Sequence, residues 1–374
     1  MNQISHFGVH AIVQLSEILK ELAPNSIFLI TGKNSYKSSG AQTLIKKLLN
    51  GYRYYKFNDF EENPRIEDVE NGIALFKKYN CDLIIAIGGG SVIDMAKLIN
   101  CFQANKNYLG IALNNEEIKH KGKKLIAIPT TSGSGSEATH FAVLYINKGK
   151  YSIENHSILP DIAIVDPQLT YSLSPYRTAV TGLDAFSHAV ESHWSINSTS
   201  ESLSFAEEAI GLIWKHLPKA VGFSATDSRN ILSYASNLAG KVINITRTTA
   251  PHALSYALTS RYNIPHGHAV SLFLPLFFEY NYNVNSNNCI DTRGYKYVQN
   301  KIEVICELLG IKSKKEMQQN IHNFIYSLGV ENNFERLNLT PNDITFIIDN
   351  VNLKRVRNNP RILEKDKLMK LIYG

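Results

Sequence analysis

The residues whose chemistry is easiest to interpret are a carboxylate and three histidines in the second half of the chain. Asp184 and His188 stand four residues apart in the helical pattern GLDAFSHAVES. This spacing places both side chains on one face of a helix, one turn apart. Farther on, His252 follows Pro251 at a predicted helix start, and His266 stands in the segment IPHG. One carboxylate and three imidazoles can surround Fe²⁺ or Zn²⁺ and leave a position open for a substrate oxygen.

A glycine-rich turn in the first half of the chain is typical of nucleotide binding. Gly88, Gly89, Gly90 and Ser91 stand between an apolar strand-like run and a helical run. Glycines at such a place let the backbone approach a pyrophosphate closely, and the helix N-terminus supplies free N–H groups. On its own, this element is also compatible with a simple tight turn.

A second turn, TTSGSGSE at 130–137, follows another predicted strand and is dense in hydroxyls and glycine. We expect Thr130, Thr131, Gly133 and Ser134 to contact the ribose phosphate or the nicotinamide amide. A hydrophilic loop is the alternative interpretation of this turn alone. Because ligands of doubly wound sheets bind at the carboxyl ends of strands, the two turns together predict a dinucleotide site.

The residues after the first long strand bear on the choice of dinucleotide. Enzymes that prefer NAD often place a carboxylate near the adenosine 2′-hydroxyl. Here Gly32, Lys33, Asn34, Ser35 and Lys37 follow the strand, without a carboxylate among them. They leave room for a 2′-phosphate and offer lysine and hydroxyl groups to it, so we expect NADP(H) to be preferred over NAD(H).

Strand-like runs alternate with helical runs from residue 26 to about residue 170. The predicted strands are 26–31, 52–57, 82–87, 125–128 and 162–165, and helical patterns between them cover 41–49, 65–78 and 92–101. Such alternation predicts a parallel, doubly wound sheet.

From about Pro175 onward, the periodic segments are helical. They include 179–194, 202–216, 230–245 and 251–260. We therefore predict an α/β dinucleotide-binding domain at 1–172, followed by an all-α domain at 173–374 that binds the metal and the substrate.

The bulk composition argues against several other classes of protein. A length of 374 residues favours two domains, and a formal charge of +6, with no basic run carrying interleaved aromatics, gives no reason to expect nucleic-acid binding. The four cysteines are far apart and contain no C-x-x-C pair, so they predict neither a disulfide framework nor a zinc ribbon. We find neither a signal-peptide pattern nor an apolar run of membrane-spanning length, and expect a cytoplasmic protein with no membrane partner.

At this point the chain resembles the iron-containing (group III) alcohol dehydrogenases, which share the dehydroquinate-synthase-like fold. The segments that carry the resemblance are GGGSVIDMAK (88–97), IPTTSGSGSEAT (128–139), ILPDIAIVDPQLT (158–170), GLDAFSHAVES (182–192), Ala239-Gly240, PHG (265–267) and NPR (359–361). The resemblance implies metal ligation by the four residues named above and a cofactor-binding part for Asp94. It also implies a homo-oligomer, such as a dimer.

This sequence departs from the family pattern at one position. The family commonly has a further histidine four residues after the third ligand, associated with proton relay, and here that position is Tyr256. Tyr256, His268, or the cofactor ribose with water are the alternatives for the proton donor.

The segment TRTTAPHALSY, which begins at residue 246, bears on the substrate. A proline in the first helical turn with a threonine as cap would leave N–H groups, hydroxyls and an arginine beside His252. We expect this arrangement to bind a phosphonate-like anion. The expected substrate-binding residues are Arg247, Thr248, Thr249, Lys241 and Asn244. A capped helix with its arginine turned to solvent is the simpler alternative.

The same segment resembles the phosphonoacetaldehyde reductases of phosphonate biosynthesis. That resemblance implies reduction of phosphonoacetaldehyde to 2-hydroxyethylphosphonate, with a small anionic aldehyde as substrate. Three alternatives remain at this stage: a dehydrogenase for a neutral alcohol or diol, a lyase of the dehydroquinate-synthase type, and a binding protein without activity.

Overall fold

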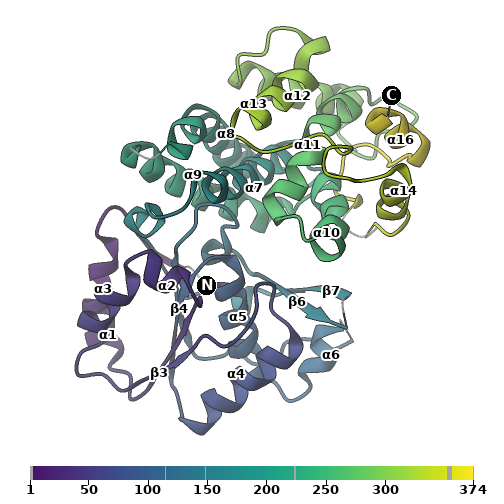
Figure 1. The fold of residues 1–374 in the computed structure, drawn as a ribbon. Helices are drawn as coiled ribbons and strands as arrows, with labels where there is room; N and C mark the ends of the chain where they lie inside the picture. Colours follow the sequence, from purple (N-terminus) through teal and green to yellow (C-terminus); the bar gives the residue numbers. More distant parts are fainter. Residues whose placement is uncertain (1–2, 114, 148, 223–224, 352–355, 374) are drawn as a thin grey trace. The chain divides into compact units, whose positions relative to one another are not determined.

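The structure is a computed structural model that describes residues 3–373 except 114, 148, 223–224 and 352–355. Contacts within the chain divide it into a first unit, Met1–Leu173, and a second unit, Ser174–Gly374 (Figure 1). The functional assignment of the parts 1–172 and 173–374 stays a prediction.

The first unit is built on a parallel six-stranded sheet with the strand order β1-β8-β5-β4-β2-β3. The strands are β1 (Ile4–Phe7), β2 (Ile27–Thr31), β3 (Tyr54–Phe57), β4 (Leu83–Gly88), β5 (Lys124–Pro129) and β8 (Ile162–Val165). The five strands predicted from the sequence are confirmed. The edge strand β1 was not predicted, because three of its four residues are exposed and the segment lacks a buried apolar pattern.

Helices cover both faces of this sheet (Figure 1). They are α1 (Gln14–Leu22), α2 (Ser35–Ser38), α3 (Ala41–Leu48), α4 (Ile66–Lys78), α5 (Gly90–Ala104) and α6 (Tyr108–Ala112). Along β4, Ile84 and Ala86 join the core under α4 and α5, whereas Leu83, Ile85 and Ile87 join the core under α1 and α3. When the side chains on both faces of a strand are buried, the strand is a continuous apolar run in the sequence. Such a run is typical of a parallel sheet that is covered by helices on both faces.

The first unit also contains an antiparallel hairpin that the sequence analysis missed. It consists of β6 (Phe141–Ile146) and β7 (Gly149–Glu154). Only alternate residues of β6 are buried, so the segment is half exposed and gave no strong strand signal.

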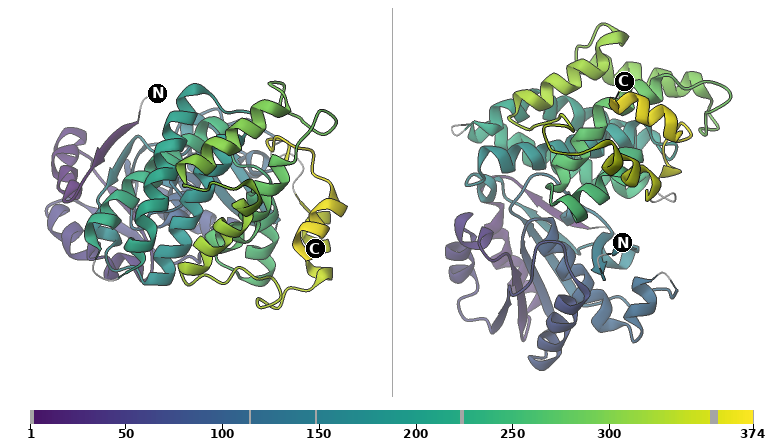
Figure 2. Two further views of the ribbon diagram at one scale, coloured as in Figure 1. Left: turned by 90° about the horizontal axis from the view of Figure 1, so that it is seen from above. Right: turned by 45° about the vertical axis from the view of Figure 1, so that its right-hand side comes forward.

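The second unit is helical, and Figure 2 shows its helices from two further directions. The helices are α7 (Pro175–Trp194), α8 (Ser200–Val221), α9 (Thr226–Thr246), α10 (Ala250–Tyr262), α11 (His266–Tyr282), α12 (Tyr295–Leu308), α13 (Met317–Ser327), α14 (Pro341–Asp349) and α16 (Lys365–Tyr373). The four helices predicted at 179–194, 202–216, 230–245 and 251–260 are confirmed, each with somewhat longer bounds. Among the described residues, no helix is both long and apolar enough to span a membrane.

Candidate metal centre and cofactor turns

Helix α7 carries the first two predicted metal ligands and is the central helix of the second unit. It begins with Ser174, whose hydroxyl accepts a hydrogen bond from the backbone N–H of Arg177, and with Pro175 in the first turn. Both features stabilise a helix start. The helix packs against α8, α9 and α11, and nearly all of its residues from 178 onward are buried. Asp184 and His188 are therefore held on a rigid, solvent-excluded element.

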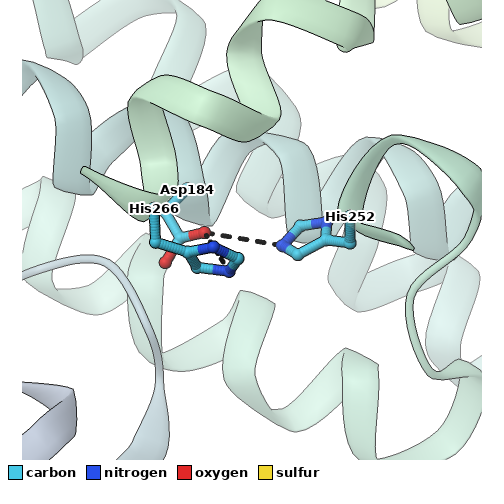
Figure 3. A group of neighbouring side chains, drawn as sticks. All are labelled: Asp184, His252 and His266. Carbon is cyan, nitrogen blue, oxygen red and sulfur yellow. Dashed lines mark ion pairs between the residues drawn. The ribbon is translucent and has the colours of Figure 1, made fainter. Parts of the chain in front are cut away.

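The four predicted ligands converge on one carboxylate oxygen. From Oδ1 of Asp184, the Nε2 atoms lie 3.9 Å away in His188, 3.5 Å away in His252 and 3.8 Å away in His266. Figure 3 shows Asp184, His252 and His266 facing one another. These three residues offer ligand atoms that all lie within 4.8 Å of one another. The His188 ring stacks on that of His252 with a centroid separation of 4.6 Å.

This geometry fits a divalent cation. Oδ1 of Asp184 and Nε2 of His252 are buried and have no hydrogen-bond partner among the described residues. Unpaired buried polar atoms are costly and call for an explanation such as a bound ion. Ligands about 2.1 Å from a tetrahedral metal are separated by about 3.4 Å, close to the 3.5–3.9 Å that separate Oδ1 of Asp184 from the three nitrogens. His188 is not part of the group whose ligand atoms all lie within 4.8 Å of one another. The donor set of one oxygen and three nitrogens suits iron or zinc equally.

Neighbouring charges in the cluster shift the pKa values of Asp184 and His252. Burial by itself would raise the pKa of Asp184, but the charges of His188, His266 and His252 outweigh it and lower that pKa below its ordinary value. Burial lowers the pKa of His252, yet the carboxylates of Glu191 and Asp184 outweigh burial and raise it to about 9. The buried carboxylates of Asp184 and Glu191 thus place negative charge beside these imidazoles.

The sequence analysis missed Glu191, which touches one of the ligands directly. Its side chain is fully buried, and its Oε1 is hydrogen-bonded to Nδ1 of His252. Asp184, His188 and Glu191 occupy positions i, i+4 and i+7 of α7, which lie on one helix face. That periodicity was the available signal, and the sequence analysis did not extend it beyond the histidine.

The glycine of the PHG segment has a steric reason. A Cβ atom at Gly267 would lie 1.9 Å from the carbonyl oxygen of Val180 and 2.9 Å from Cβ of Asp184. The start of α11 therefore approaches the backbone of α7 more closely than any side chain allows. This close approach brings His266 to Asp184.

The two predicted proton donors differ in their surroundings. The Tyr256 ring lies parallel to the ring of His266, with a centroid separation of 6.0 Å. In contrast, Nε2 of His268 is 2.5 Å from the carbonyl oxygen of Glu331, and its Nδ1 is 2.9 Å from the Tyr176 hydroxyl. A carbonyl only accepts, so Nε2 carries the proton and Nδ1 of the neutral ring accepts from tyrosine. Burial also lowers the pKa of His268.

The relay prediction for His268 is corrected accordingly. Both of its ring nitrogens are used within the protein, and the hydrogen-bonded chain ends at a backbone carbonyl, which cannot pass a proton on. Tyr256 beside His266 stays as the prediction for a proton donor from this chain.

The predicted anion pocket before α10 also needs a correction. Thr249 is the N-cap residue of α10, but its side chain makes no capping hydrogen bond. Its N–H and its hydroxyl both donate to Oε2 of Glu191, at 2.7 Å each, and the hydroxyl accepts from Nε1 of Trp194. The polar groups of Thr249 are therefore used by Glu191 and Trp194 and do not face a substrate. The negative group at the start of α10 is the carboxylate of Glu191.

Arg247 and Thr248 have different surroundings from Thr249. Arg247 is exposed and adopts φ 59° and ψ 176°, a region that is essentially restricted to glycine. Neighbouring bonds hold this backbone: the hydroxyl of Thr246 donates to Oγ of Ser192, and the carbonyl of Thr248 accepts from Asn358. Such strain costs about 1–3 kcal/mol and is concentrated at functional sites. Lys241 and Asn244, the other predicted substrate-binding residues, lie half-buried on α9.

In the first unit, the two glycine-rich turns lie against each other. The N–H of Thr130 donates to the carbonyl of Gly88 at 3.0 Å. A Cβ atom at Gly89 would lie 3.4 Å from Cγ2 of Thr131, and one at Gly90 would lie 2.6 Å from Oγ of Ser134. The turns follow the adjacent strands β5 and β4, so the predicted cofactor residues share one edge of the sheet.

The N-terminus of α5 completes this edge. Its N-cap residue, Gly89, makes no side-chain capping bond to this fifteen-residue helix. Uncapped N–H groups beside backbone free of Cβ atoms suit a pyrophosphate. Asn63 donates its backbone N–H to the hydroxyl of Ser91, and this bond ties the turn to the segment before α4.

Asp94 has an indirect part rather than the expected direct one. Its Oδ1 accepts from the hydroxyl of Ser136 and its Oδ2 from the N–H of Val143. Nearby, the fully buried Lys97 donates to Ser136, Thr139 and the carbonyl of Phe141 at 2.8–3.1 Å. These bonds anchor the turn 130–137 to α5, a network that the sequence analysis did not identify.

Acidic residues after β3 lie beside the lysine that we expected to favour NADP(H). Nζ of Lys33 lies 2.7 Å from Glu61 and 4.0 Å from Asp59. The lysine expected to receive a 2′-phosphate already has a carboxylate partner. The prediction of NADP(H) rested on the residues after β2 alone, whereas the sheet places the end of β3 next to them.

A parallel sheet with a glycine-lined turn, together with a helical unit in which four predicted metal ligands converge, is what we expect of a metal-dependent nicotinamide oxidoreductase. Comparison with known families gives the same class. Residues 2–167 match the family model described as iron-containing alcohol dehydrogenase, and residues 178–373 match that of the C-terminal part of the family. The chain belongs to the iron-containing alcohol dehydrogenase family, and it is an NAD-dependent alcohol dehydrogenase or aldehyde reductase.

Individual relatives agree with this assignment. The chain is 35% identical to long-chain-alcohol dehydrogenase 1 of Geobacillus thermodenitrificans over 74% of its own length and 71% of that protein. It is 31% identical to 1,3-propanediol dehydrogenase of Citrobacter freundii over 77% of this chain and 76% of that one. A solved structure of sulfoacetaldehyde reductase from Bifidobacterium kashiwanohense in complex with NAD⁺ has a TM-score of 0.88 at 29% identity, covering 99% and 96% of the two chains.

Proposed function

We propose that this dehydrogenase reduces a short anionic aldehyde to a primary alcohol, and specifically phosphonoacetaldehyde to 2-hydroxyethylphosphonate. The balanced reaction consumes one aldehyde, one reduced nicotinamide dinucleotide and one proton. The observation that carries the proposal is the convergence of three imidazole nitrogens on Oδ1 of Asp184 at 3.5–3.9 Å.

The residues of the cluster have distinct parts in this proposal. Asp184, His188, His252 and His266 hold the cation, with His188 and His252 fixed by the stacking of their rings. When bound, the cation supplies Lewis acidity toward the substrate oxygen, and the nicotinamide supplies the hydride. Tyr256, whose ring lies beside that of His266, is the group of this chain that we expect to donate the proton.

The preference for an anion rests on Arg247 and its neighbours. Arg247 lies five residues before His252, in a backbone conformation that its neighbours hold against strain. A guanidinium can bind a phosphonate or sulfonate with two parallel hydrogen bonds. Thr248, Lys241 and Asn244 are the further residues that we expect to support the anion. The similarity to a sulfoacetaldehyde reductase, whose named substrate is also an anionic aldehyde, supports this choice.

A neutral short alcohol or diol is the second candidate substrate. The similarity to 1,3-propanediol dehydrogenase favours it, and so does the finding that the first turn of α10 is partly occupied by Glu191. The two candidates predict opposite responses to the loss of Arg247.

The decisive experiment measures reduction rates for phosphonoacetaldehyde, sulfoacetaldehyde and propanal in wild type, Arg247→Ala and a control, Lys215→Ala. Lys215 is an exposed cation on α8. For an anionic substrate, Arg247→Ala should raise KM at least about tenfold, equivalent to about 1.4 kcal/mol, while KM for propanal stays unchanged. Equal effects on anionic and neutral aldehydes would refute the anion proposal, and a wild-type preference for propanal would favour the second candidate.

The preference for NADP(H) over NAD(H) stays a prediction, and the structure suggests how to test it. Because Glu61 pairs with Lys33, Glu61→Gln should release the lysine and raise the ratio of kcat/KM for NADPH to that for NADH. Gly32→Asp should lower this ratio, since it adds a carboxylate next to Ser35, whose hydroxyl must rotate to admit it. Unchanged ratios in both variants would remove the role assigned to this segment.

We also propose that the protein is a cytoplasmic homo-oligomer, such as a dimer, as the family resemblance implies. Light scattering coupled to size-exclusion chromatography measures its molar mass in solution. A mass of 42.0 kDa, that of one chain, would contradict the proposal.

A further inference from the structure

Glu191 lies between the metal cluster and the segment that leads into α10. Its side chain is fully buried. Oε1 is hydrogen-bonded to Nδ1 of His252, while Oε2 accepts from both the N–H and the hydroxyl of Thr249, each at 2.7 Å. Behind Thr249, the indole Nε1 of Trp194 donates to the same hydroxyl at 3.0 Å.

The directions of these hydrogen bonds determine the tautomer of His252. A carboxylate has only acceptor atoms, so Nδ1 must carry the proton in the bond to Glu191. In a neutral ring, Nε2 then carries a lone pair. Nε2 is the nitrogen that lies 3.5 Å from Oδ1 of Asp184. In the neutral ring, which is the form that ligates a metal, the side of His252 that faces the cluster is therefore an electron-pair donor.

We propose that Glu191 is a positioning residue that holds His252 in the tautomer and ring orientation needed to ligate the metal, and that Thr249 and Trp194 fix Glu191 in turn. The inference rests on the metal centre proposed above. Carboxylates that accept a proton from a metal-bound imidazole make the ring a better ligand, and losing them typically costs about 10–100-fold in metal affinity.

Glu191→Gln separates positioning from simple space filling. An amide offers one acceptor and one donor end. If its oxygen faces Thr249, its NH₂ group faces Nδ1 of His252 and favours the tautomer with the proton on Nε2, which cannot ligate. If its oxygen faces His252, its NH₂ group meets the N–H of Thr249, donor to donor. Either arrangement keeps the volume of the side chain but loses part of the hydrogen bonding that Glu191 provides to His252 and Thr249.

The chain contains a control in a second histidine–carboxylate pair, in which the histidine is buried and the carboxylate is partly exposed. Nε2 of His193 lies 3.0 Å from Oε1 of Glu207, and this histidine is not one of the four ligands. Glu207→Gln makes the same chemical change to a histidine–carboxylate pair in the same unit. It should leave metal affinity within about twofold of wild type, because it alters no ligand.

The experiment titrates Co²⁺ into the metal-free full-length protein, with affinities measured by chelator competition and the visible absorption of the bound ion. Glu191→Gln should bind Co²⁺ about 10–100-fold more weakly than wild type. In the Zn²⁺-loaded protein with ¹⁵N-labelled histidine, wild type and Glu207→Gln should each show the Nδ1–H signal of His252 at the same position, and in Glu191→Gln this signal should be shifted or lost.

The outcomes distinguish this inference from the proposed function. Failure of wild type to bind Co²⁺ would refute the metal centre, whereas equal Co²⁺ affinity of folded Glu191→Gln and wild type would refute only the positioning role. If Glu191→Gln does not fold, Thr249→Val serves instead, since it removes the hydroxyl but keeps the backbone donor. That variant should weaken Co²⁺ binding several-fold, and an unchanged affinity would overturn the proposal.

Discussion

The metal cluster and the glycine-rich turns are built in opposite ways. In the cluster, the predicted metal ligands are side-chain atoms, and four side chains meet there from α7, α10 and α11. In the turns, the working atoms belong to the backbone, and glycines keep side chains away from the uncapped start of α5. Removal of a side chain should therefore damage the first region, and addition of one should damage the second.

The two regions also keep their polar groups in place differently. His252 is held through Glu191, and this chain of bonds continues to Thr249 and Trp194. The turn 130–137 is held by Lys97 and Asp94 of α5, which are both hydrogen-bonded to the hydroxyl of Ser136. Neither Glu191 nor Lys97, both of them buried, was among the predicted site residues, and neither follows from a motif rule for ligands.

The largest expected effect comes from His266→Ala. Loss of one of four ligands should remove the bound metal and lower turnover by about a thousandfold or more, because an open three-residue cluster binds metal far more weakly. Elemental analysis of bound metal together with initial rates measures both quantities. Near-native activity in this variant, or in wild type after chelation, would mean that the cluster is not a metal centre.

The contribution of Lys97 to the stability of the first unit should depend on pH. Burial lowers the pKa of Lys97 to about 8, against an ordinary value of 10.5. Between these values the unfolded chain holds a proton that the folded chain has lost, so the contribution of Lys97 to stability rises with pH. From pH 8 to pH 10.5 the stability of wild type relative to Lys97→Met should increase by up to about 3 kcal/mol.

Urea unfolding of both proteins at several pH values measures this difference. Comparing the two variants cancels the contributions of other groups that titrate in the same range. A difference independent of pH would show that the lysine keeps its ordinary pKa in the folded protein.

Adding a methyl group at Gly267 should break the metal region without touching a ligand. The new Cβ would collide with the carbonyl of Val180, so the start of α11 must move and carry His266 away from Asp184. We expect a loss of stability of about 1–3 kcal/mol and weaker Co²⁺ binding. Gly211→Ala is the control, since its Cβ meets nothing within 4 Å in the middle of α8 and should stabilise the helix by about 0.5–1 kcal/mol. Equal behaviour of the two variants would contradict the steric argument.

A methyl group at Gly90 should have the smallest of these effects and only on the cofactor. Its Cβ would lie 2.6 Å from Oγ of Ser134, a side-chain atom that can rotate. We expect KM for the dinucleotide to rise about tenfold, which corresponds to about 1.4 kcal/mol, with metal content unchanged. Fluorescence titration with the reduced dinucleotide checks this, and unaltered cofactor binding would exclude the turn from the site.

Much of the architecture was predictable because it depends on local patterns. The strands β2, β4 and β5 are continuous apolar runs, and α7 combines a proline start with the i, i+4 pair Asp184 and His188. The missed elements β1, β6 and β7 are mostly exposed or half-exposed, so their residues show no clear apolar pattern. Residue types alone also misjudged Thr249 and His268, whose polar atoms turned out to be used by partners far away in the sequence.

By itself, the sequence determined the order of the main helices and strands and the glycine-rich turns, since helical and strand periodicity depends on neighbouring residues. The four predicted metal ligands came from the residues and from the family resemblance that they carry. Only the tertiary structure decided that the three imidazoles share one oxygen of Asp184, that Glu191 sets the ring of His252, and that Glu61 already pairs with Lys33. These contacts join residues from 4 to 82 positions apart. Most of them depend on how helices and strands pack, and this packing cannot be predicted from patterns among neighbouring residues.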